Sequence, residues 1–182
     1  MALKTIATLM LGGLLTLAST VQAEDCSDCR PAEFIRLPIV IPAEVTQLSI
    51  QGYQQESPVL GLELNAATNA FVTLLYLPPD QLYGAYTREP AFITGIDAAP
   101  EFFAAITDPA RSDKGITFVR KSMAIDGAEL VRITRNDVAI YWFKTPDPLN
   151  QKAYFIKEGQ TGAYQLAGPF SERFFQTFIR RL

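Results

Sequence analysis

The sequence contains no histidine, and this absence removes several classes of enzyme at once. Hydrolases whose serine or cysteine nucleophile relies on histidine as a base are excluded, as are the common zinc hydrolases whose metal is held by histidines. The G-x-G-x-x-G, Walker A and G-x-S-x-G motifs are also missing. A carboxylate pair that cleaves a glycan needs no histidine, but no spacing among the 19 acidic residues singles out such a pair. We therefore predict no catalytic residue, no cofactor and no metal site.

Long apolar runs are absent beyond the N-terminus, so we predict no transmembrane segment. The first 23 residues have a lysine at position 4, an apolar run from Ile6 to Leu17 and a small-residue ending at Ala23. This is the layout of a cleaved signal peptide, and its apolar run is too short for a spanning helix. We expect cleavage after Ala23 and a location in the periplasm.

An excess of positive charge is missing as well. One of the 16 basic residues lies within residues 1–23, so 15 basic residues remain against 19 acidic ones, a net charge of −4. Nucleic acid and anionic membrane surfaces are poor partners for such a chain. The 159 residues that remain of 182 after cleavage have the size of one ordinary domain.

Cysteine is nearly absent, since Cys26 and Cys29 are the only two. In an oxidising compartment we expect them to form a disulfide, whose very small loop stabilises the fold little. A redox-active Cys-x-x-Cys normally follows a strand and opens a helix, and the Arg30-Pro31 that follows here does not fit that pattern. We expect a flexible segment at residues 24–33, followed by a single globular domain at residues 34–182.

The first half of this domain consists mostly of predicted strands. They are expected at Phe34–Ile41, Val45–Gly52, Val59–Leu64, Ala70–Leu77 and Phe92–Ile96, and the third and fourth pair as a hairpin. Pro38 interrupts the first strand, which indicates a broken edge strand. A helix is predicted from Ala98 to about Thr107, with Asp97 as its cap and Asp108-Pro109 as its end.

The second half carries the strongest pattern, a run of short strands closed by one amphipathic helix. The strand candidates are Ile116–Met123, Glu129–Arg135, Val138–Lys144, Lys152–Lys157 and Ala163–Ala167. Ser171 can cap the helix, and Phe170 can pack on Phe175. The apolar stripe of the helix comprises Phe174, Phe175, Phe178, Ile179 and Leu182. We predict an α+β fold, in which this helix packs an antiparallel meander and the N-terminal half adds a second strand-rich layer.

Turn spacing predicts how the meander strands pair. A two-residue loop at Asp126-Gly127 places Lys121 opposite Arg132, and one at Asn136-Asp137 places Arg132 opposite Tyr141. Lys121, Arg132 and Tyr141 would then form a row on the face away from the helix, with the charge and aromatic area that binding hot spots favour. We expect Arg132→Glu to remove the repulsion from Lys121, to fold at least as well and to lose its partner. If the turns are not two-residue loops, the three residues are not opposite one another and the row does not form.

The ending from Tyr164 to Ser171 is a strand that runs through a glycine into a capped amphipathic helix. It resembles the close of several small exported α+β domains, including those of the PsbP-like group. The resemblance implies this arrangement of strand and helix at the C-terminus and no particular function.

Three classes of function remain open. The first is a non-catalytic periplasmic protein that binds another protein, for example an inhibitor or an immunity protein that neutralises a toxin. The second is a carrier or sensor of a small or lipidic ligand, for which the 12 phenylalanines and 7 tyrosines offer apolar lining. The third is a histidine-free enzyme that acts on the cell wall. We favour the first class, with a protein partner in the envelope, while the sequence indicates no particular oligomeric state.

Overall fold

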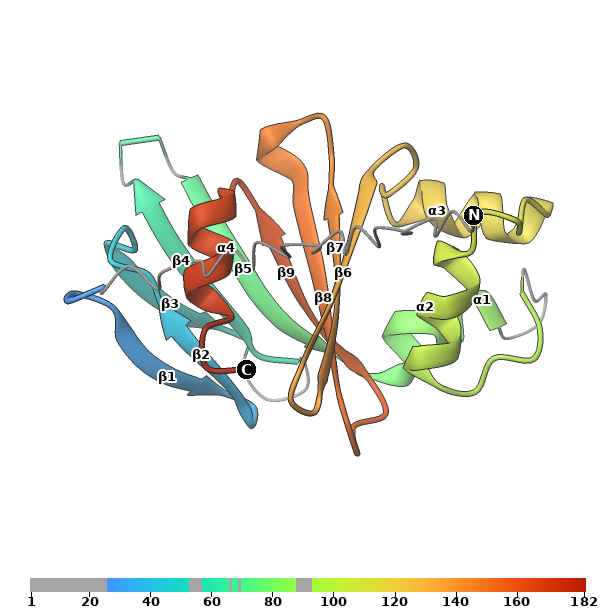
Figure 1. The fold of residues 1–182 in the computed structure, drawn as a ribbon, viewed down its shortest axis with the longest axis horizontal. Helices are drawn as coiled ribbons and strands as arrows, with labels where there is room; N and C mark the ends of the chain where they lie inside the picture. The colour runs from blue at the N-terminus through green and yellow to red at the C-terminus, as the bar shows by residue number, and fades with distance from the viewer. Residues whose placement is uncertain (1–25, 53–56, 66, 69, 88–92) are drawn as a thin grey trace, which may run out of the picture.

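The computed structural model describes residues 26–52, 57–65, 67–68, 70–87 and 93–182. Within these ranges the chain forms an α+β fold around a seven-stranded antiparallel sheet, which confirms the predicted fold class (Figure 1). The strand order across the sheet is β3-β4-β5-β9-β8-β7-β6. The strands are β3 Gln47–Gln51, β4 Val59–Asn65, β5 Ala70–Leu77, β6 Glu129–Arg135, β7 Val138–Lys144, β8 Gln151–Lys157 and β9 Ala163–Gly168.

The two halves of the chain share this sheet, because β9 pairs with β5. Strands β6 to β9 form the predicted meander, and β4 and β5 form the predicted hairpin. A second, smaller sheet consists of β1 Arg30–Phe34 and β2 Leu37–Ile41. The second strand-rich layer is therefore this hairpin, while β3 to β5 extend the main sheet.

Strands β1 and β2 replace the broken edge strand predicted for Phe34–Ile41. The chain reverses at Ile35 and Arg36, whose φ angles are 48° and 66°. A β-branched residue rarely adopts a positive φ, and the Asn-Gly signal of a tight hairpin is missing, so the sequence did not reveal this turn. The Tyr164 hydroxyl of β9 donates to the Ile35 carbonyl and ties the turn to the main sheet. Since β1 begins at Arg30, residues 30–33 are paired in a strand rather than loose.

Helix α4, Glu172–Phe178, covers one face of the sheet together with β1 and β2. The predicted cap is confirmed, since the Ser171 hydroxyl accepts the Phe174 N–H at 3.1 Å. The predicted packing of Phe170 on Phe175 is also present, with 5.9 Å between the ring centres. All five residues of the predicted stripe are buried. The stripe therefore supplies much of the core on this face.

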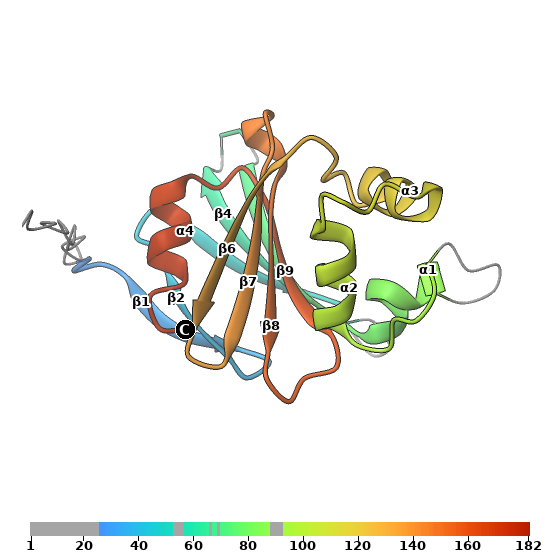
Figure 2. The same cartoon turned by 45° about the vertical axis from the view of Figure 1, so that its right-hand side comes forward.

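The other face is covered by helices from the middle of the chain, and Figure 2 shows them across the sheet from α4. They are the π-helix η1 Asp80–Gly84, α1 Ala85–Thr87, α2 Ala99–Thr107 and α3 Lys114–Ser122. A short 3-10 helix, η2 Pro148–Asn150, precedes β8. Phe102, Phe103 and Ile106 of α2 are buried in this second core. No helix in the described part of the chain is long and apolar enough to cross a membrane.

Two predictions around α2 are wrong. The α2 N-cap is Ala98, which lacks a side-chain cap, while the Asp97 N–H donates to the Glu101 carboxylate at 3.0 Å. The strand predicted at Phe92–Ile96 is not formed at residues 93–96, and Phe92 lies outside the described residues.

The largest correction concerns Ile116–Met123, which was predicted as a strand and lies almost wholly in helix α3. Its β-branched residues favour a strand locally. However, Ile116, Val119 and Met123 follow at helical spacings of three and four and are all buried. The Asp113 carboxylate caps the helix by accepting the Ile116 N–H at 3.0 Å, and this bond lowers the pKa of Asp113. Burial in the second core, where α3 packs against α2, and this cap therefore override the local strand preference.

Candidate partner-binding site

A half-open pocket of about 210 Å³ lies where the ends of α2 and α3 meet strands β6 and β7. Its lining comes from the end of α2 (Ile106, Thr107, Pro109), from α3 (Arg120), from the turn at residues 125–128, and from Leu130 and Phe143 of the two strands. Six of the ten lining residues are apolar, but polar and apolar atoms contribute about equally to the surface of the pocket, which includes one cation, Arg120, and one carboxylate, Asp126. Water in the liquid occupies about 30 Å³ per molecule, so the pocket can hold one large side chain or a molecule of similar size.

Two arginines hold the α2 end of this pocket in place. The Arg120 Nε donates to the Ile106 carbonyl at 2.8 Å, and its Nη2 donates to the Asp108 carbonyl at 2.6 Å. The Arg132 Nη2 donates to the Thr107 carbonyl at 3.3 Å and also to the Thr107 hydroxyl. The last carbonyls of a helix have no partner within it and carry partial negative charge. Both guanidinium groups therefore stabilise the C-terminus of α2.

The C-terminus of α3, which lies at the other side of the pocket, is also stabilised by hydrogen bonds to its carbonyls. Ala124 adopts a left-handed conformation with a φ of 51°, and the N–H groups of Ala124 and Ile125 bond back to carbonyls of the last helical turn. This is the Schellman arrangement that ends many helices. The ammonium group of Lys152 on β8 donates to the Met123 carbonyl at 2.5 Å, and its burial lowers the pKa of Lys152. A cation from the sheet thus stabilises the end of each helix.

The turn predicted at Asp126-Gly127 is present, but it links α3 to β6 rather than two strands. The Ala128 N–H donates to the Ile125 carbonyl at 3.2 Å, and Gly127 has a φ of 75°, which favours glycine. Asp126 and Gly127 are exposed, whereas Ala128 is half-buried. The turn therefore contributes two exposed residues and one half-buried residue to the lining of the pocket.

Two of the three predicted partner-binding residues lie together. Arg132 and Tyr141 are opposite each other in β6 and β7, as predicted, and the Arg132 guanidinium carbon lies 5.7 Å from the centre of the Tyr141 ring. Tyr141 also stacks on Phe103 of α2, with 4.9 Å between the ring centres. Lys121 is an exposed residue of helix α3 and is not paired with Arg132. The predicted row of three is wrong, because residues 114–122 form a helix.

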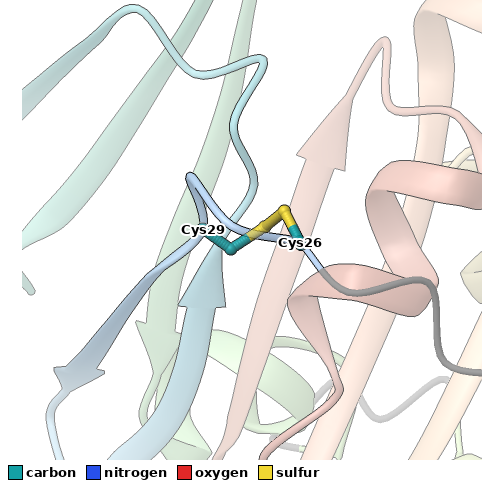
Figure 3. The surroundings of a disulfide bond; sticks show 2 residues. All are labelled: Cys26 and Cys29. Atoms are coloured by element: carbon teal, nitrogen blue, oxygen red, sulfur yellow. A yellow bond between two sulfur atoms is a disulfide. The ribbon is translucent and has the colours of Figure 1, made fainter.

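The disulfide between Cys26 and Cys29 is present as predicted. Figure 3 shows it in the turn directly before β1, and the two Cα atoms are 5.3 Å apart. The Cys29 N–H donates to the Cys26 carbonyl at 3.3 Å within the same turn. The bond thus closes one small loop and joins no distant parts of the chain.

Sequence reasoning missed the pocket because its walls are the ends of two helices, one of which was predicted as a strand. Two signals were available: Asp108-Pro109, which ends α2, and Asp113, which caps α3. Together they indicate two helices in close succession. In the part of the chain that the structure describes, no group of three or more cysteine, aspartate or glutamate side chains is placed to hold a metal ion.

No family model, no curated protein and no solved structure matches this chain. What the protein does must therefore be inferred from its own residues.

Proposed function

We propose that this protein is an exported, non-catalytic binding protein that recognises another protein in the periplasm. The observation that carries the proposal is the half-open pocket, whose surface is polar and apolar in about equal parts and which has a cation beside it. Leu130 and Phe143 line the pocket, and the Arg132 guanidinium is bonded to Thr107, which lines it as well. A partner can insert one apolar side chain as an anchor and place a carboxylate near Arg132.

The size of the pocket favours a protein partner over a small or lipidic ligand. Sites for drug-sized molecules usually enclose about 300–1,000 Å³. The pocket of about 210 Å³ is smaller than this range, and it is half open. A single side chain fills such a space, while the rest of a protein partner lies on the surrounding surface.

The sequence supports the proposed location and kind of partner. Residues 1–23 have the layout of a signal peptide, which supports export from the cytoplasm, and the acidic balance disfavours nucleic acid as a partner. An inhibitor or immunity-type protein, which acts by occupying its target, needs a rigid surface and no catalytic group. Helix ends stabilised by Arg120, Arg132 and Lys152 provide such rigidity.

The pocket can be filled to test the proposal. Ala128 lines the pocket and is half-buried, whereas Ala104 is exposed on α2 and does not line it. Tagged parent protein, Ala128→Leu and Ala104→Leu are each recovered by osmotic shock and used to capture proteins from envelope extract. We expect one protein to bind the parent and Ala104→Leu at equal molar amounts, and Ala128→Leu to capture it at least about tenfold less well. Circular dichroism confirms that all three are folded.

Other outcomes of this experiment decide against the proposal. Equal capture by Ala128→Leu would mean that the pocket takes no part in binding. A lipid or small molecule that co-purifies with the parent in place of a protein would support the carrier or sensor class. An intact mass that includes residues 1–23 would contradict export through a cleaved signal peptide.

A further inference from the structure

The two edges of the seven-stranded sheet differ in charge. Within the described residues, β3 and β6 each pair with one neighbour only, so they form the edges. β6 carries three charged residues, Glu129, Arg132 and Arg135. Charges on an edge strand oppose pairing with another chain. β3 contains no charged residue, and its Leu48 and Ile50 are 41% and 69% exposed. β3 therefore lacks the usual protection of an edge.

The residues of β3 match a second copy of the same strand. The strand reads Gln-Leu-Ser-Ile-Gln, so each position has the same kind of residue when it is read in either direction. An antiparallel copy, related by a two-fold axis at Ser49, places Gln47 opposite Gln51 and Leu48 opposite Ile50. A two-fold interface must be self-complementary in this way. No like charges meet in this register, and all five residues are paired.

The apolar side chains of β3 also lie on the correct face for such pairing. Leu48 is opposite Leu62 of β4, and Ile50 is opposite Leu60, and both partners belong to the core beneath α4. A second β3 strand would bring its own Leu48 and Ile50 to the rim of that core. The core would then continue from one copy into the other, and the two most exposed aliphatic residues of the strand would be covered.

From these observations we infer that two copies of this protein pair through β3, which joins their sheets into one continuous sheet. A strand of this length provides a small contact, and small interfaces are weak and reversible. The dimer should therefore form as the concentration rises. The pocket lies beside β6, at the opposite edge of each sheet, so both pockets stay accessible and the dimer can bind two partner groups at once. The inference does not depend on the proposed function.

A charge at the strand tests the interface. Ile50→Lys places a lysine on the exposed side of β3, and Leu149→Lys makes a similar change at a residue that is 65% exposed in the β7–β8 connection. Sedimentation velocity over a range of concentrations should show a reversible dimer for the parent and for Leu149→Lys. Ile50→Lys should weaken the dimer by at least about tenfold, because the two-fold axis brings the new lysines close together.

A cysteine on the two-fold axis tests the register. Ser49→Cys lies opposite its own copy, at the Cα separation of about 4.5–5.5 Å found in antiparallel pairs, which suits a disulfide. Gln51→Cys lies roughly 14 Å from its copy in the same register. Mild oxidation should therefore link Ser49→Cys into covalent dimers and leave Gln51→Cys monomeric. A parent that stays monomeric at every concentration, or a dimer that Ile50→Lys does not weaken, would overturn the inference. So would a dimer in which Gln51→Cys crosslinks as readily as Ser49→Cys.

Discussion

The two faces of the central sheet are covered by helices that are held in different ways. On one face, α4 is held by packed aromatic rings, and Phe175 lies 4.3 Å from Trp142 between ring centres. On the other face, Phe103 of α2 is packed against Tyr141 at 4.9 Å. On this face, the cationic side chains of Arg120, Arg132 and Lys152 also donate hydrogen bonds to carbonyls at the helix ends.

The contacts that hold the helices on the two faces therefore differ in kind. Some join residues that are close together in the sequence, and others join residues that are far apart. The α4 cap joins Ser171 to Phe174, three residues later, and both residues come shortly after strand β9 in the sequence. The cations on the other face are between 12 and 29 positions from the carbonyls they bond. The first kind of contact can be predicted from the sequence, because its two residues lie within one helical turn of each other. The second kind exists only once tertiary packing has brought distant residues together.

The largest effect is expected for the α4 face. Phe178 is fully buried and lies 6.0 Å from Phe155 and 6.0 Å from Phe174 between ring centres. Phe178→Ala removes these contacts and leaves a cavity, which typically reduces the free energy of unfolding by about 3–5 kcal/mol. That is a large part of the about 5–15 kcal/mol that stabilises a domain. Urea unfolding followed by circular dichroism measures the loss.

Gln176, an exposed residue of the same helix, provides the matched control. Gln176→Ala should change the free energy of unfolding by less than about 0.5 kcal/mol, as exposed substitutions usually do. Similar unfolding curves for the two variants would mean that the α4 stripe does not form the core on this face.

A smaller effect is expected for Arg132→Glu on the other face. Sequence reasoning predicts that this variant folds at least as well as the parent, because it removes a clash with Lys121. In the structure, Arg132 instead bonds to Thr107 at the C-terminus of α2. Glutamate loses these bonds and adds a negative charge where the helix end is already negative. We expect a loss of about 1–2 kcal/mol in the free energy of unfolding, reduced by solvent because the site is exposed.

Two further variants distinguish the two accounts. Arg132→Lys keeps the charge near the helix end and should lose less stability than Arg132→Glu. Lys121→Ala should have little effect, since Lys121 is an exposed residue of α3. If Arg132→Glu were as stable as the parent, the bonds to Thr107 would contribute nothing, and α2 would be held by its apolar residues and by Arg120.

Much of the fold could be predicted because its signals lie close together in the sequence. Asn136-Asp137 set the register of β6 and β7 correctly, so that Arg132 faces Tyr141. The sheet order could not be read in the same way, because the pairing of β5 with β9 joins Thr73 to Ala167 across almost the whole domain. Only tertiary packing selects that neighbour.

The candidate site was predicted less well than the fold. The predicted register of β6 and β7 is correct, so Leu130 and Phe143 lie on the same face of the sheet as Arg132 and Tyr141, and both line the pocket. The prediction failed at Ile116, Thr117 and Val119, whose branched side chains outweighed the helix signal of Asp113. The helix and strand propensities of its residues do not decide which structure such a segment forms. Burial of its apolar side supplies most of the free energy that makes it helical. The register error for Lys121 followed directly from this one misreading.

The smallest effect tests that misreading directly. Ala124 follows α3 with a φ of 51°, a conformation that strains alanine by about 1–2 kcal/mol and glycine hardly at all. Ala124→Gly should therefore raise the free energy of unfolding by about 0.5–1 kcal/mol, after the greater freedom of glycine in the unfolded chain is subtracted. The matched variant Ala104→Gly, at an exposed position inside α2, should lower it by about 0.5–1 kcal/mol. Thermal melting should show the two shifts in opposite directions. A loss of stability in both variants would mean that residue 124 is not a left-handed helix end, as expected if residues 116–123 formed the strand that the sequence predicts.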